Sequence, residues 1–202
     1  MEQLETMEYY ILQTQDILNS VYKNKEQTDK LAQVYVDGNY KNIKIIASGS
    51  SGNGSWCAKY IMEIYLYVDV TIISPYTFAY YPRLSEDDFM FVVSQSGYSK
   101  NALDALDVLK KLNRKTIALT GDVNSDIKDH AEVVIDYVDE EKEGYVTKGV
   151  TTLALFLIKL AFAILEKQGK EVDTKWLDDY CESYASIQKE NFIREEAFLE
   201  KF

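Results

Sequence analysis

The chain is poor in the residues on which many metal and redox sites depend. Its 202 residues include one histidine, two cysteines and two prolines. The cysteines, Cys57 and Cys181, are far apart and form no CxxC pair, so we expect reduced thiols in a cytoplasmic protein. Ligand-spaced clusters of histidine, thiol or carboxylate are absent, as are Walker and GxGxxG loops, so we expect no metal and no cofactor.

Basic residues are also fewer than acidic residues, 22 against 33. The net charge is −11, which argues against nucleic acid as a partner, because a phosphate backbone requires a cationic face. The N-terminus has no basic segment followed by an apolar stretch of the signal-peptide type. The most apolar segment, residues 151–165, contains Lys159 and reads as too short and too interrupted to span a bilayer. We therefore expect it to be a buried helix and expect no membrane partner.

What the sequence does contain is an alternation of short aliphatic runs with amphipathic helical segments. This alternation predicts an α/β fold, a three-layer αβα sandwich around a five-stranded parallel sheet of the flavodoxin-like order 2-1-3-4-5. Residues 1–40 are expected to form an N-terminal helical segment, 41–168 the sheet domain, and 169–202 a C-terminal helix or linker. The predicted strands are residues 43–47, 68–73, 89–93, 116–119 and 133–137.

Two hydroxyl-rich loops follow the first and third of these strands. They are residues 48–55 (SGSSGNGS) and 94–99 (SQSGYS). The two strands are neighbours in the predicted order, so both loops are expected at the switch point where ligands bind. Each loop opens a helix, whose free N–H groups and dipole attract an anion, and the glycines allow close approach. This pattern favours a phosphate monoester site. The alternative is a pair of polar turns with serine helix caps.

The two loops resemble the phosphosugar loops of the SIS (sugar isomerase) domain family, and the resemblance covers about residues 30–165. It is closest to the first of two such domains in the isomerase half of glucosamine-6-phosphate synthase and in fructosamine-6-phosphate deglycases. The resemblance implies a hexose or amino-hexose 6-phosphate as ligand, and a homodimer. The residues that it implies for phosphate and sugar binding are Ser50, Ser51, Asn53, Ser94, Gln95, Ser96, Ser99, Val146 and Lys148.

Several of these candidates have structural alternatives. Glu141, similar to the family's Glu…Thr-Lys element, is the catalytic candidate, but residues 139–143 also read as a solvated acidic loop. Lys148 begins an apolar helix, where a cation opposes the helix dipole, which favours a ligand or a structural partner. Asn53 is either a loop-shaping residue or a sugar ligand. His130 precedes the fifth predicted strand, at the edge away from the crevice, so we expect a structural or surface role.

Three functions fit these features: a phosphosugar isomerase or deglycase, a non-catalytic sugar-phosphate sensor, and a dimerisation scaffold. In the tandem-domain enzymes of this family, the catalytic glutamate and histidine lie in or after the second domain. This chain has no second copy of the loops. We therefore expect either the N-terminal half of a longer protein or a single-domain relative that completes its site by dimerising. In both cases the chain alone is expected to bind phosphosugar better than it turns it over.

Overall fold

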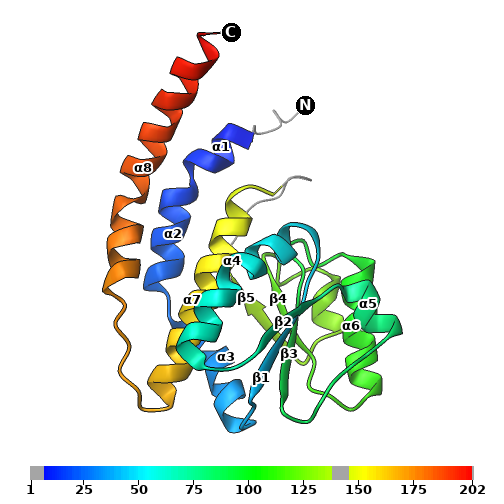
Figure 1. The fold of residues 1–202 in the computed structure, drawn as a ribbon. Helices are drawn as coiled ribbons and strands as arrows, with labels where there is room; N and C mark the ends of the chain where they lie inside the picture. The colour runs from blue at the N-terminus through cyan, green and yellow to red at the C-terminus, as the bar shows by residue number, and fades with distance from the viewer. Residues whose placement is uncertain (1–6, 138–145, 202) are drawn as a thin grey trace. The chain divides into compact units, whose positions relative to one another are not determined.

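The computed structural model describes residues 7–137 and 146–201, and its centre is a parallel sheet (Figure 1). The sheet has five strands in the order β2-β1-β3-β4-β5, and all of its pairings are parallel. The predicted fold class and strand order are confirmed. The strands are β1 (Asn42–Ile46), β2 (Val70–Ile73), β3 (Asp88–Val93), β4 (Ile117–Thr120) and β5 (Val133–Asp136).

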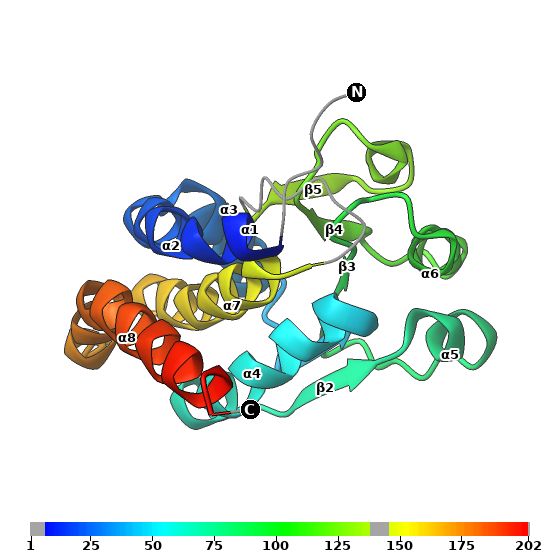
Figure 2. The same ribbon diagram turned by 90° about the horizontal axis from the view of Figure 1, so that it is seen from above.

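Helices cover both faces of the sheet, which gives the predicted three layers (Figure 2). On the first face, α2, α3 and α4 all pack against α7. That group contains α1 (Met7–Leu12), α2 (Thr14–Lys23), α3 (Glu26–Asp37), α4 (Gly49–Leu66) and α7 (Lys148–Lys167). The other face carries α5 (Pro75–Tyr80), α6 (Lys100–Lys111) and the 3₁₀ helix η1 (Asp126–Asp129).

The central strand β3 is buried at every residue, as expected for a parallel strand covered on both faces. On the α5–α6 side it contributes Met90 and Val92 to an apolar cluster with Phe78, Leu106 and Ile127. Ile46 at the end of β1 belongs to the same cluster, and the parallel pairing of Ile46 with Val92 places the ends of β1 and β3 beside each other. The sheet therefore provides a stable base for the loops that follow these two strands.

Helix α7 is the apolar centre of the first helical layer. By length and composition it is the one helix within residues 7–137 and 146–201 that could cross a membrane, yet most of it is buried inside the protein. The prediction of a buried helix is confirmed, whereas the argument from short length is wrong because the helix has 20 residues. The Nζ of Lys159 donates to the carbonyl oxygens of Val21 and Asn24 at the end of α2. A cation is favourable at a helix C-terminus.

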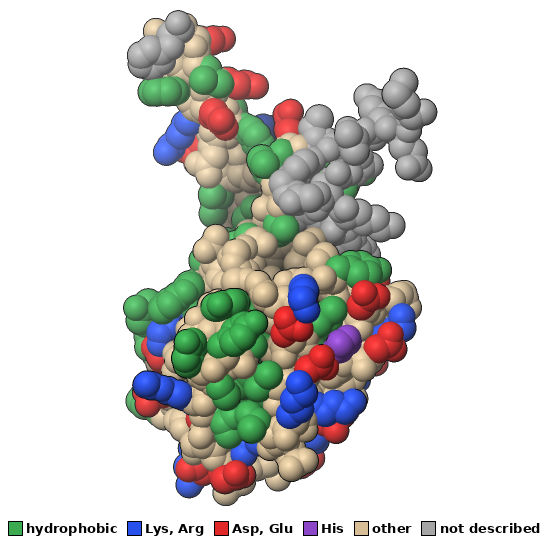
Figure 3. Space-filling view, turned by 90° about the vertical axis from the view of Figure 1, so that its right-hand side faces the viewer, with side chains coloured by type: hydrophobic (Ala, Val, Ile, Leu, Met, Phe, Trp, Pro, Cys, Tyr) green, Lys and Arg blue, Asp and Glu red, His purple; other side chains and the backbone are tan. Residues whose placement is uncertain are grey.

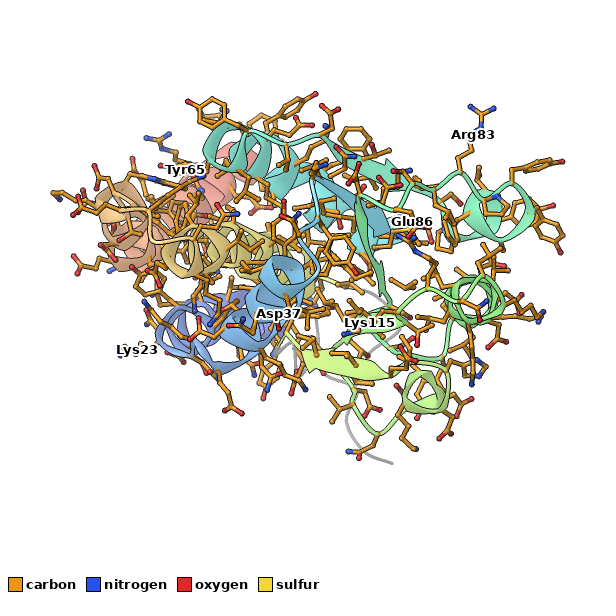
Figure 4. The ribbon with its side chains drawn as sticks, turned by 90° about the horizontal axis from the view of Figure 1, so that it is seen from below. Lys23, Asp37, Tyr65, Arg83, Glu86 and Lys115 are labelled. Carbon is orange, nitrogen blue, oxygen red and sulfur yellow. The ribbon has the colours of Figure 1, made fainter. Side chains whose placement is uncertain are left out.

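A partly buried ion pair joins β1 to β3 near the amino edge of the sheet, which Figure 4 views from below. The Nζ of Lys44 lies 2.6 Å from Oδ2 of Asp88, whose side chain is almost fully buried. The backbone N–H of Ser85 also donates to this carboxylate, at 2.6 Å. Burial raises the pKa of Asp88, but the hydrogen bonds from Lys44 and Ser85 outweigh it, so the net pKa is lowered.

The chain divides into two compact units, the first ending at Glu171 and the second beginning at Val172. The second unit contains α8 (Lys175–Leu199), a helix of 25 residues. Pairs four residues apart, Lys175 with Asp179 and Glu190 with Arg194, connect its charged side chains. Such exposed pairs are screened by solvent and stabilise a helix only slightly.

Candidate functional site

A pocket opens at the carboxyl edge of the sheet, above the neighbouring strands β1 and β3. Figure 2 views the protein from this edge. The pocket encloses about 460 Å³ of empty space, part of which is open solvent. Its lining residues are Ser48, Gly49, Ser50, Ser51, Pro75, Val93, Ser94, Gln95, Ser96, Ser99 and Ala102.

The first side of the pocket is the start of α4. Ser48 is extended, with φ −144° and ψ 169°, and its carbonyl accepts the N–H of Gly52 at 3.1 Å to begin the helix. Gly49 has φ +57°, a left-handed conformation that glycine adopts without a steric penalty. This sharp turn takes the chain from β1 directly into α4. The first helical turn, with its unpaired N–H groups, is thereby presented to the pocket.

The second side is the loop of residues 94–97, followed by the start of α6. Gly97, with φ +71°, closes a turn in which its N–H donates to the carbonyl of Ser94 at 3.1 Å. Ser99 is then the extended N-cap residue of α6. The N-termini of α4 and α6 therefore both border the pocket. The positive ends of two helix dipoles lie beside one small cavity.

The serine side chains do not act as helix caps. Neither Ser48 nor Ser99, the N-cap residues of α4 and α6, makes a side-chain capping bond. Within the part of the chain that the structure describes, the hydroxyl groups of Ser50 and Ser94 also have no hydrogen-bond partner. This disfavours the interpretation as capped polar turns. Hydroxyl groups at the pocket are left available to a ligand.

Charged side chains are absent from the described lining of the pocket. An anion there would be held by neutral donors, namely hydroxyls and backbone N–H groups, together with the two helix dipoles. Such a site suits a phosphate group even in a protein of net charge −11. In the described residues no group of three or more histidine, cysteine or acidic side chains is placed to hold a metal ion.

The structure brings together six of the site residues proposed from the sequence, and leaves four outside the pocket or undescribed. Asn53 is exposed on α4 and does not line the pocket. Val146 and Lys148 also lie outside the lining, and Glu141 falls outside the described residues. The six residues that line the pocket are Ser50, Ser51, Ser94, Gln95, Ser96 and Ser99.

Lys148 has a structural partner within the protein. It is buried at the first residue of α7, and its Nζ donates to Oε1 of Gln13 at 2.7 Å. The same Nζ lies 5.0 Å from the centre of the Tyr10 ring, within the range of a cation–π contact. Both partners come from the N-terminal helical region, whose contact with α7 the sequence pattern could not specify. In this arrangement Lys148 fastens α7 to that region.

His130 has the structural position that the sequence analysis expected. Its Nδ1 lies 2.7 Å from Oδ1 of Asp107, which joins the end of η1 to α6. Pro75 is a lining residue that the sequence analysis missed, since α5 has only six residues and too little periodicity to be recognised. The Ser74-Pro75 pair was the available signal, because proline is common at the first position of a helix.

Comparison with known proteins agrees with this architecture. The SIS domain family matches residues 39–164. Glutamine–fructose-6-phosphate aminotransferase (isomerizing) of Caldanaerobacter subterraneus is 29% identical over 166 residues, which is 80% of this chain and 26% of that protein. The chain thus spans about a quarter of this curated relative.

Two solved structures share the fold. The C-terminal domain of glucosamine-fructose-6-phosphate aminotransferase from Francisella tularensis has a TM-score of 0.72 at 19% identity, covering 93% of this chain and 55% of that one. A protein of Escherichia coli CFT073, solved in complex with a ligand, has a TM-score of 0.68 at 15% identity, covering 80% of this chain and 89% of that one. The chain therefore shares its fold with one protein of similar length and with about half of a longer one.

Proposed function

The chain belongs to the SIS domain family, and on this basis we propose that its pocket binds the phosphate group of a sugar phosphate. The observation that carries the proposal is the convergence of two helix N-termini, with uncapped serines, on one pocket whose described lining residues carry no charge. Neutral donors and helix dipoles are a recurrent means of holding phosphate. The ligand class that we propose is a hexose or amino-hexose 6-phosphate.

We propose further that the chain is part of a phosphosugar isomerase or deglycase. Proton transfer between two sugar carbons requires a nearby acid or base, which typically contributes roughly 10²–10⁴-fold in rate. Carboxylate and imidazole groups are missing from the described pocket lining. Glu141, or a group from a second subunit or domain, would have to supply that function. The alternative is a sugar-phosphate sensor, which would bind the same ligand without turning it over.

An assay of this chain with fructose 6-phosphate and fructosamine 6-phosphates separates the two roles. Turnover that falls strongly in Glu141→Gln, with unchanged binding, would favour the enzyme. Binding with no turnover, alone or with added partner domains, would favour the sensor. Glu143, in the same acidic run, is the alternative counterpart of the family's glutamate. Robust turnover that survives both Glu141→Gln and Glu143→Gln would mean that the catalytic group lies elsewhere.

The double variant Ser94→Ala/Ser96→Ala tests the proposed phosphate site directly. Each serine hydroxyl that no longer donates to the charged phosphate is expected to weaken binding by about 1.5–3 kcal/mol. Titration calorimetry with glucose 6-phosphate, with glucose as the uncharged comparison, measures the change. Ser20→Ala, an exposed serine on α2, is the matched control. Equal affinity of the double variant and the wild type would contradict the proposal.

We also infer that the chain forms a homodimer. Apolar side chains follow one stripe of α4, where Trp56, Tyr60 and Ile64 are all at least half exposed, and Tyr67, the residue after the helix, is more exposed still. Figure 3 shows hydrophobic side chains gathered over α5 as well, and Tyr76, Tyr80 and Tyr81 are exposed there. Monomeric proteins rarely leave such patches uncovered.

Sedimentation equilibrium at micromolar concentration is expected to show twice the mass of the chain. Ile64→Glu should shift the protein towards the monomer, because a buried carboxylate opposes association. The control, Leu112→Glu, also replaces an exposed apolar residue, at the C-terminal end of α6 and outside both patches. A single-chain mass for the wild type would overturn the dimer.

A further inference from the structure

The loop of residues 94–97, here called the anion loop, is held from outside the pocket by residues 120–127, here called the support segment. The support segment leaves the end of β4 and contains the start of η1. It contributes no residue to the pocket lining. Its contacts with the anion loop are nevertheless polar and specific, and they fall on main-chain atoms of the loop.

The first contact fixes the carbonyl oxygen of Gln95. The N–H of Gly121 donates to this oxygen at 2.9 Å. The hydroxyl of Thr120 lies 3.2 Å from the same oxygen, and Thr120 is fully buried. The hydroxyl is itself oriented by the N–H of Asp122, which donates to it at 3.1 Å. The same hydroxyl also lies 3.3 Å from the carbonyl oxygen of Asp122, so its one proton has two acceptors in reach. Of these, the Gln95 carbonyl also accepts the N–H of Gly121.

The second contact fixes Gly97. The N–H of Ile127 donates to the carbonyl of Gly97 at 3.2 Å. The buried hydroxyl of Ser125 lies where a side chain at position 97 would project, 1.8 Å from an ideal Cβ. Ser125 is kept there by a 2.5 Å hydrogen bond to the carbonyl of Asp122. The support segment thus restrains the loop at both Gln95 and Gly97.

Because the peptide unit is planar, this restraint on the Gln95 carbonyl also sets the direction of the N–H of Ser96. In a trans peptide the carbonyl of one residue and the N–H of the next point in opposite directions. Because the Gln95 carbonyl points to the support segment, the N–H of Ser96 points to the other side of the loop. Ser96 lines the pocket, and its N–H has no hydrogen-bond partner in the described residues.

We propose that Thr120 is a positioning residue, which aims the N–H of Ser96 at the phosphate by fixing the peptide plane between Gln95 and Ser96. The proposal rests on the proposed phosphosugar site for its ligand. It rests on the Thr120–Gln95 contact for its mechanism. The hydroxyl acts through the loop and does not touch the ligand.

Three variants separate positioning from general stabilisation. Thr120→Val removes the hydroxyl with little change of shape, and Thr120→Ser restores it. Thr116→Val is the matched control, since Thr116 is equally buried near the other end of β4 and its hydroxyl accepts the N–H of Glu132 at 2.9 Å. By calorimetry with glucose 6-phosphate, Thr120→Val is expected to bind about 10-fold more weakly than the wild type. Thr120→Ser and Thr116→Val should bind nearly as the wild type does.

Hydrogen exchange of the ligand-free protein gives a readout that does not depend on binding. The amides of Gly97 and Gly121, both hydrogen-bonded at the loop, should exchange faster in Thr120→Val and unchanged in Thr116→Val. Unaltered exchange or unaltered affinity in Thr120→Val would overturn the proposal. If the wild type binds no phosphosugar, the proposed function fails, and the exchange experiment still decides whether Thr120 fixes the loop.

Discussion

Replacing Gly97 with alanine is expected to destabilise the protein by about 3 kcal/mol and to abolish measurable phosphosugar binding. Two penalties combine at this position. The left-handed φ of +71° costs a residue with a side chain about 1 kcal/mol. The added Cβ would overlap the Ser125 hydroxyl at 1.8 Å, and such overpacking costs roughly 1–3 kcal/mol. Urea unfolding measures the loss of stability, and calorimetry with glucose 6-phosphate measures the loss of binding.

Two other glycines provide matched controls for this variant. Gly169, after α7, has φ +74° and no atom within 4 Å of an added Cβ. Gly49, at the pocket, has φ +57° and is equally open. Alanine at either position should therefore show the conformational penalty alone, about 1 kcal/mol. If Gly97→Ala is no less stable than Gly169→Ala, the overlap with Ser125 is relieved by a small shift and the argument from packing is wrong.

Replacing Lys44 with methionine is expected to destabilise the protein by about 3 kcal/mol at neutral pH. The variant leaves the carboxylate of Asp88 buried without its cation, and breaking a buried pair in this way is costly. Arg114 does not substitute for Lys44, because its guanidinium pairs with Glu86 and donates to the main-chain carbonyl of Ser85. The free energy of unfolding, measured in urea, reports the loss.

The pH dependence of this loss identifies its cause. In the wild type the pKa of Asp88 is lowered, so its contribution is present above the unfolded pKa, about 3.9, and is lost as the pH falls through the folded pKa. In Lys44→Met burial should instead raise that pKa. The difference in stability between the two proteins should therefore narrow in acid.

A neighbouring exposed pair is the control for this experiment. Lys41 and Asp87 lie 3.2 Å apart, but both side chains are about half exposed or more. Lys41→Met is expected to cost less than about 1 kcal/mol, as is usual for surface pairs. Adding Asp88→Asn to Lys44→Met should recover part of the lost stability. A loss independent of pH, or equal in Lys41→Met, would show that Lys44 acts through packing alone.

The sheet was predictable because a parallel strand covered on both faces must be apolar throughout. The run of residues 89–93 satisfies that condition completely, and β3 is buried at all of its residues. The other four runs are mostly aliphatic and each contains one or two polar residues. Helix boundaries were harder to predict. The sequence predicts a helical segment over residues 1–40, and the described part of it contains three helices, α1, α2 and α3, with short breaks near Gln13 and Asn24. Neither break contains the glycine or proline that marks a helix end.

The start of α4 shows tertiary packing overriding local propensity. The sequence pattern predicts a loop over residues 48–55 that opens a helix, but residues 49–55 themselves form the first two turns of α4. Gly54 explains why small residues are needed there. A Cβ on it would lie 2.9 Å from the carbonyl oxygen of Val150 and 3.1 Å from the Leu153 side chain, so α4 and α7 approach very closely. A single sequence does not reveal that contact.

The candidate site was predictable where it depended on local pattern and not where it depended on distant partners. The serines that line the pocket could be predicted, because they come directly after two strands that are neighbours at the switch point of the sheet. The placement of Lys148 depends on Gln13, 135 residues away in the sequence. The role proposed for Thr120 depends on a carbonyl 25 residues away. Such pairings are determined by the assembled fold.

The attachment of Lys159 to the end of α2 has a consequence for how the protein is made. Lys159 and Val21 are 138 residues apart in the chain, so α2 cannot acquire this contact until nearly the whole sheet unit has left the ribosome. Contacts of such long sequence separation form late, because a large loop must close first. Until then the apolar faces of α2 and α3 have no α7 to cover them. The newly made chain therefore passes through a stage in which its first helices are exposed to chaperones and to aggregation.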